Sequence, residues 1–95
     1  MGIALRRNSV PTKVIEAGRY PRHRVCGEFI SGLGIQALTD FQLDGLLEGA
    51  SRPAIHSAFF TVNQLVAKHR LPSAAITVSR FHLDAVLAEE FCRIG

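Results

Sequence analysis

The chain has 95 residues, of which 47% are hydrophobic, and its formal net charge is +3. This length allows one small domain, residues 1–95, and excludes two, while the hydrophobic share excludes a disordered chain. No apolar run approaches the about 20 residues that cross a bilayer, so we expect no transmembrane segment. The sequence shows no signal peptide, and we therefore expect a reducing, cytoplasmic setting.

The spacing of cysteine and histidine argues against a metal centre. Cys26 and Cys92 form no CxxC pair and have no histidine at ligand spacing. Neither a structural zinc site nor another metal site is therefore expected. In a chain without a signal peptide, the two thiols are also expected to stay reduced.

The first quarter of the chain predicts a helix, a strand and a basic loop. Residues 2–8 predict the last turns of a helix, whose two arginines suit the negative end of the helix dipole. Residues 13–16 predict a short buried strand that ends on Glu16, because the β-branched pair within it fits a sheet interior. Residues 19–28 predict a loop that gathers three arginines, a histidine, a cysteine and a glutamate. That collection indicates binding more than structure.

The remaining residues predict a broken helix, a hairpin and a final helix. The expected ranges are a turn at 29–34, one broken or two short helices at 35–47, a strand at 54–66 that can turn at 63–64, a polar loop at 68–72 and a strand at 74–78. Ser79 predicts the N-cap of the last helix, which carries an apolar stripe, with Glu90 among the acids on its other faces. The expected fold class is α/β, with a β-hairpin and a C-terminal helix.

Glu16 carries the clearest chemical hypothesis. A carboxylate at the end of a strand in a nucleotide-binding unit can accept hydrogen bonds from both ribose hydroxyls. Spacing alone leaves open an ordinary solvated glutamate. The glycine-rich fingerprint that accompanies such an acid lies about 20 residues before it, which here falls at or before Met1. We therefore do not expect this chain to contain that fingerprint.

Two stretches carry a resemblance to a known family. Residues 14–31, V-I-E-A-G-R-Y-P-R-H-R-V-C-G-E-F-I-S, resemble the second strand and following loop of FAD-dependent oxidoreductases of the geranylgeranyl reductase, flavin-dependent halogenase and aromatic hydroxylase-like group. Residues 78–90, V-S-R-F-H-L-D-A-V-L-A-E-E, resemble the Ser-Arg-aromatic-x-Leu-Asp segment that opens a helix after a hairpin in the same group. The residues between these stretches carry no signature.

The resemblance implies a partial Rossmann-like FAD-binding domain that lacks the first strand and the glycine-rich turn. It implies that Glu16 binds the adenosine ribose and that Arg24 lies along the ribityl or pyrophosphate portion. It implies further that Gly27 allows close backbone approach, that Cys26 lies near the flavin, and that Arg80 makes one more contact. A thiolate at Cys26 is favoured by the nearby arginines, but packing is its expected role because the sequence places no base beside it. Catalytic residues are not indicated.

The resemblance therefore implies that this chain is a fragment of a flavoprotein oxidoreductase or monooxygenase. That parent protein is expected to act on a small molecule, with NAD(P)H as one electron donor. The residues leave reductase, hydroxylase and halogenase chemistry open. We expect the chain alone to bind FAD weakly and to be inactive. The competing interpretation is a small basic domain, not an enzyme, that binds nucleic acid or a protein partner. Nucleic acid is not expected, because the arginine clusters lack interleaved aromatic residues. A pseudogene product is the third alternative.

Overall fold

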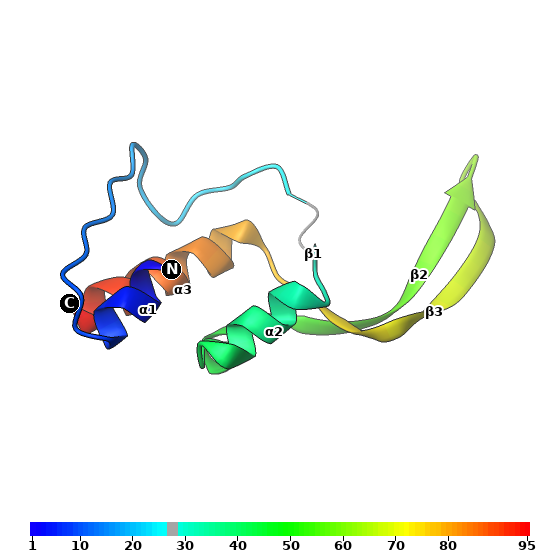
Figure 1. Cartoon of the computed structure of the whole chain (residues 1–95). Helices are drawn as coiled ribbons and strands as arrows, with labels where there is room; N and C mark the ends of the chain where they lie inside the picture. The colour runs from blue at the N-terminus through cyan, green and yellow to red at the C-terminus, as the bar shows by residue number, and fades with distance from the viewer. Residues whose placement is uncertain (27–28) are drawn as a thin grey trace.

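A computed structural model describes residues 1–26 and 29–95 of the chain. The elements in order are helix α1 (Gly2–Arg7), strand β1 (Phe29–Ile30), helix α2 (Leu33–Asp40), 3-10 helix η1 (Asp44–Leu47), strands β2 (Arg52–Thr61) and β3 (Gln64–Thr77), and helix α3 (Arg80–Ile94). The strands form one antiparallel sheet in the order β1-β3-β2 (Figure 1). The chain is therefore a small mixed α/β domain.

The hairpin of β2 and β3 is the largest element and confirms the predicted β-hairpin. Its turn lies at Val62 and Asn63, one residue before the predicted position, and both residues have positive φ. The polar loop expected at residues 68–72 is wrong, because β3 continues through it. His56 pairs with Arg70 in this part of the ladder, and backbone pairing of this kind favours a strand whatever the polarity of the side chains.

The strand predicted at residues 13–16 is also wrong. These residues have no regular secondary structure, and Val14 and Ile15 are exposed, Ile15 to 87%. An extended segment becomes a strand only when a neighbour pairs with its backbone groups. The described part of the chain places no strand beside this segment, and it contains no parallel strand pair of the Rossmann-like kind.

The helical predictions hold, and their local signals explain why. α1 occupies most of the predicted residues 2–8, and α2 with η1 forms the expected pair of short helices. The Ser79 hydroxyl accepts a hydrogen bond from the His82 N–H at 3.3 Å, as an N-cap of α3 should. The turn predicted at residues 29–34 instead begins with β1, which pairs with the last residues of β3.

The core is small and lies where α1, α3, η1 and the end of β3 meet. Leu47 is the most buried large side chain, at 2% exposure. Its companions are Ile3, Leu43, Ala75 and Val78. The hairpin projects away from this core, so the molecule is elongated, with extents of 52 × 27 × 20 Å (Figure 1).

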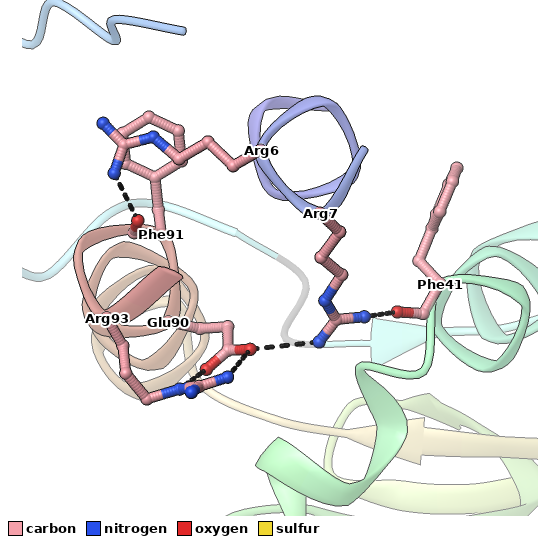
Figure 2. A network of polar contacts seen from close by, with 6 residues as sticks. All are labelled: Arg6, Arg7, Phe41, Glu90, Phe91 and Arg93. Carbon is pink, nitrogen blue, oxygen red and sulfur yellow. Dashed lines mark hydrogen bonds and ion pairs between the residues drawn. The ribbon is translucent and has the colours of Figure 1, made fainter. Parts of the chain in front are cut away.

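Arg6 and Arg7 of α1 bind residues of α3 (Figure 2). The Arg6 guanidinium lies 3.5 Å from the centroid of the Phe91 ring and donates to the Phe91 carbonyl at 2.6 Å. Arg7 Nη2 donates to Glu90 Oε1 at 3.0 Å, and Arg93 donates to both oxygens of the same carboxylate at 2.6 and 2.8 Å. The helix pair therefore has a polar seam beside its apolar contacts.

The placement of Glu90 on a solvent face of the last helix is a wrong prediction. Its side chain is only 6% exposed. Hydrogen bonds from Arg93 first, and then from Arg7, lower the pKa of Glu90 to about 2. A buried carboxylate is tolerated when charged partners surround it, and one of these partners comes from the far end of the chain.

Candidate functional site

Glu16 is held by the loop that follows it. The Gly18 N–H donates to Glu16 Oε1 at 3.0 Å, and the Tyr20 hydroxyl donates to Oε2 at 3.0 Å. Arg22 Nη2 lies 2.9 Å from Oε1 as an ion pair. The carboxylate is thus fixed by groups within six positions of it along the chain, although no strand supports it.

This environment keeps Glu16 ionised. The Gly18 hydrogen bond contributes most, followed by Arg22 and Tyr20, and together they lower the pKa of Glu16 to about 2. An ionised carboxylate offers about four acceptor positions on its two oxygens. The Gly18 N–H and the Arg22 ion pair both lie at Oε1, whereas Oε2 accepts from the Tyr20 hydroxyl, so Oε2 keeps acceptor capacity for a ligand hydroxyl.

Sequence reasoning did not single out Arg22 and Tyr20 as partners of Glu16. The Arg22 Nε and Nη2 atoms are buried, and no hydrogen bond to a described residue satisfies them. The ion pair with Glu16 therefore compensates the guanidinium charge, and the Tyr20 ring lies 5.1 Å from its central carbon. The signal available in the sequence was an acid followed closely by an aromatic residue and an arginine in one loop.

The basic loop is packed against the start of α3. The His23 ring stacks on Phe81, with 4.7 Å between ring centroids and 29° between planes. The Cys26 side chain interacts with Arg80 and contributes to raising the pKa of that guanidinium. The structure thus brings together Cys26 and Arg80, two of the residues that the sequence proposed for one site.

Arg80 is already engaged with a carboxylate of its own helix. Arg80 Nε and Nη2 donate to the two oxygens of Asp84 at 2.8 and 2.7 Å. This bidentate pair is the main cause that raises the pKa of Arg80. A guanidinium has five N–H bonds, and one fixed in this way presents the three that Asp84 does not take in defined directions.

An open pocket of about 480 Å³ lies between α1, the Glu16 loop and α3, and its lining includes Asp84 but neither Cys26 nor Arg80. That volume is within the range of small-molecule sites. Its lining includes Met1 and Gly2 at the start of α1, Glu16 and Tyr20 of the loop, and Asp84 and Phe91 of α3. Both stretches that carry the family resemblance therefore contribute to one pocket, in which an ionised carboxylate stands beside apolar and aromatic walls.

Two of the residues proposed for the site, Arg24 and Gly27, are not placed in the contact between the two stretches. Arg24 is exposed, and no hydrogen bond or ion pair joins it to another described residue. Gly27 lies outside the described residues. Within residues 1–26 and 29–95, no group of three His, Cys, Asp or Glu side chains could hold a metal ion. In the same residues, no helix has the length and apolarity to cross a bilayer.

Comparison of this chain with protein families, with curated proteins and with solved structures finds no match.

Proposed function

We propose that this chain is part of the FAD-binding domain of a flavin-dependent oxidoreductase, with a Rossmann-like cofactor site that further protein completes. The observation that carries the proposal is the contact between the two stretches that resemble this family. His23 stacks on Phe81, Cys26 interacts with Arg80, and Glu16 shares a pocket with Asp84. Segments far apart in the sequence therefore meet, and one of their contacts joins Cys26 and Arg80, to both of which the resemblance assigns cofactor contacts.

The pocket suits the adenosine end of the cofactor. The ionised Glu16 has an acceptor position left on Oε2 for a ribose hydroxyl, and the Phe91 ring supplies an apolar wall. Arg24 is exposed, and the resemblance assigns it to the phosphate portion, for which a guanidinium is well suited. Cys26 and Arg80 lie together on the side assigned to the flavin, and Gly27 is assigned a close backbone approach.

The exposure of residues 13–16 supports a site completed by further protein. Val14 and Ile15 have the character of a sheet interior, yet Ile15 is 87% exposed. In a Rossmann-like sheet, neighbouring strands bury such a pair. We therefore expect the chain alone to bind FAD weakly and to be inactive.

The bound flavin supplies the redox chemistry in such an enzyme, while the protein binds and orients it. This assignment makes the complete protein an oxidoreductase or monooxygenase that acts on a small-molecule substrate. Its electrons would come from a donor such as NAD(P)H. The residues of this chain belong to cofactor binding rather than to the reacting centre.

The test is an NMR titration of the isotope-labelled chain with FAD, with FMN as the matched ligand that lacks the adenosine ribose. We expect FAD to shift the signals of Glu16, Cys26 and Arg80 in fast exchange. Glu16→Gln should weaken FAD binding about tenfold, because a hydrogen bond to a charged acceptor is lost. The same change should leave FMN binding as it was.

Glu48→Gln is the matched control, because Glu48 is an exposed acid that follows η1 and lies outside the pocket lining. It should leave the FAD titration unchanged. FAD shifts that avoid the pocket, or equal losses in the Glu16 and Glu48 variants, would contradict the proposal. Tight stoichiometric binding of FAD by this chain would overturn the expectation that further protein completes the site.

A further inference from the structure

The hairpin of β2 and β3 projects away from the rest of the fold (Figure 1). Its far end carries exposed apolar side chains. We call residues 59–66 the hairpin end. Its five large apolar side chains are all exposed, with Phe60 at 67% and Val62 at 95%. They are Phe59, Phe60, Val62, Leu65 and Val66. So much apolar surface at one extremity of an elongated molecule marks an interaction site.

Basic side chains follow directly behind this end. The sequence contains no aspartate or glutamate between residues 52 and 77. In the ladder His56 pairs with Arg70, His69 pairs with Ser57, and Lys68 pairs with Ala58. We call His56, Lys68, His69 and Arg70 the basic collar. Apolar and basic side chains are thus separated along the hairpin instead of alternating.

Val62 has a backbone conformation that is unfavourable for a valine. Its φ is 45° and that of Asn63 is 62°, so both central residues of the turn are left-handed, as in a type I′ turn. Glycine and asparagine adopt this conformation readily, whereas a β-branched residue pays a conformational cost. A strained, exposed valine at the outermost point indicates a role in contact rather than in folding.

We propose that the hairpin end inserts into the headgroup region of an anionic lipid bilayer, with the basic collar against the lipid phosphates. At about 3.3 Å per residue, the turn lies about 10 Å beyond the Phe59–Ala67 pair. Interfacial protein segments bury about 5–10 Å into the boundary of headgroups and acyl chains. The collar then lies at headgroup level, within the Debye length of about 8 Å at physiological salt.

The charge and shape of the hairpin favour this occupant over two others. A second copy of the chain would bring one acid-free, positively charged hairpin against another. A single-stranded nucleic acid stacks its bases on planar side chains, whereas three of the five apolar side chains at the hairpin end, Val62, Leu65 and Val66, are aliphatic. An anionic membrane surface binds both kinds of side chain, because its acyl boundary accepts aliphatic groups and its headgroups attract cations.

The test is sedimentation with vesicles of phosphatidylcholine, with and without about 30% phosphatidylserine, at about 0.15 M salt. We expect binding to the anionic vesicles, weakening as salt is raised, and far weaker binding to phosphatidylcholine alone. The chain has no tryptophan, so Phe60→Trp gives a clean reporter. Its fluorescence should shift to the blue with anionic vesicles, whereas Leu33→Trp, at an exposed apolar position on α2, should not respond.

Variants of the hairpin distinguish an effect on vesicle binding from an effect on the stability of the fold. The double change Lys68→Gln with Arg70→Gln should weaken anionic binding about thirtyfold, since each basic residue near such a surface contributes about fivefold. Lys13→Gln, an exposed lysine outside the hairpin, should have no such effect. Val62→Gly should raise resistance to urea by relieving the turn, and it should weaken vesicle binding at the same time.

Several results would overturn the proposal. One is equal binding to both vesicle types. Another is a Val62→Gly variant that gains stability but binds vesicles as before. A third is binding to a single-stranded RNA oligonucleotide, with no vesicle binding, that is lost in the Lys68/Arg70 variant, because this would assign the hairpin to nucleic acid.

Discussion

A methyl group added at Gly18 should release Glu16 from its arginine. A Cβ atom at Gly18 would lie 1.7 Å from Arg22 Nη1, so the guanidinium of Gly18→Ala must move away. Gly18 is not among the positive-φ glycines, and its N–H bond to Glu16 remains. The pKa of Glu16 should therefore rise from about 2 part of the way to the ordinary 4.5, because the hydrogen bonds from Gly18 and Tyr20 remain while the hydrogen bond and the charge of Arg22 are lost.

The measurement is an NMR titration of the Glu16 side-chain carboxyl carbon from pH 7 to pH 1.5. A residue-specific signal is needed because Glu90 titrates over the same range. Gly45→Ala is the matched control, since a Cβ atom there meets nothing within 4 Å. A pKa of Glu16 that stays at about 2 in Gly18→Ala would refute the assigned role of Arg22.

The sign of the stability effect follows from the lowered pKa. Glu16 contributes stability that is fully present above its ordinary pKa of 4.5 and is lost as the pH falls through about 2. In Gly18→Ala the folded-state pKa of Glu16 is higher, so the pH range over which this stability is lost should end above pH 2. Acid unfolding of that variant should therefore show a smaller contribution from Glu16 than the unchanged chain does.

Three further predictions concern the framework that holds the site. Leu47→Ala should lower the free energy of unfolding by about 2–5 kcal/mol in urea, because the side chain is 2% exposed. Glu90→Gln should lower the Tm at pH 7, since Arg7 and Arg93 then face each other across a neutral amide, and should flatten the pH dependence between 4.5 and about 2. Ser79→Ala should cost about 1 kcal/mol and reduce the helical CD signal, because α3 loses its cap.

Each of these framework predictions has a result that would contradict it. A Leu47→Ala change as mild as one at the exposed Leu33 would mean that the core lies elsewhere. A Glu90→Gln variant with an unchanged Tm and acid transition would mean that the α1–α3 seam does not contribute to stability. Ser79→Ala should be compared with Ser73→Ala, which changes a serine within β3 and leaves the cap intact.

Local signals in the sequence predicted most of the elements. The cap at Ser79 and the apolar stripe of α3 each act over a few residues, so these parts of the chain can be interpreted without their partners. The same holds for α1 and for the division between α2 and η1. Local chemistry misled at residues 13–16, where a β-branched pair suggested a strand that has no neighbour to pair with.

For the candidate site, the sequence supplied the residues and tertiary structure decided which of them meet. Cys26 and Arg80 lie together, and Glu16 shares a pocket with Asp84. Arg24 is exposed and takes no part in the contact between Cys26 and Arg80. Residue types indicate what a side chain can bind, but they do not say which side chains will be neighbours.

The sequence by itself determined the helices, the hairpin and the ionisable groups of the basic loop. Only the tertiary structure decided that Glu90 is buried between Arg7 and Arg93, and that His23 stacks on Phe81. The physical reason is that helix caps, apolar stripes and tight turns follow from interactions between near neighbours in the sequence. The burial of a charge or the stacking of a ring instead depends on a partner that arrives only when the chain folds back on itself.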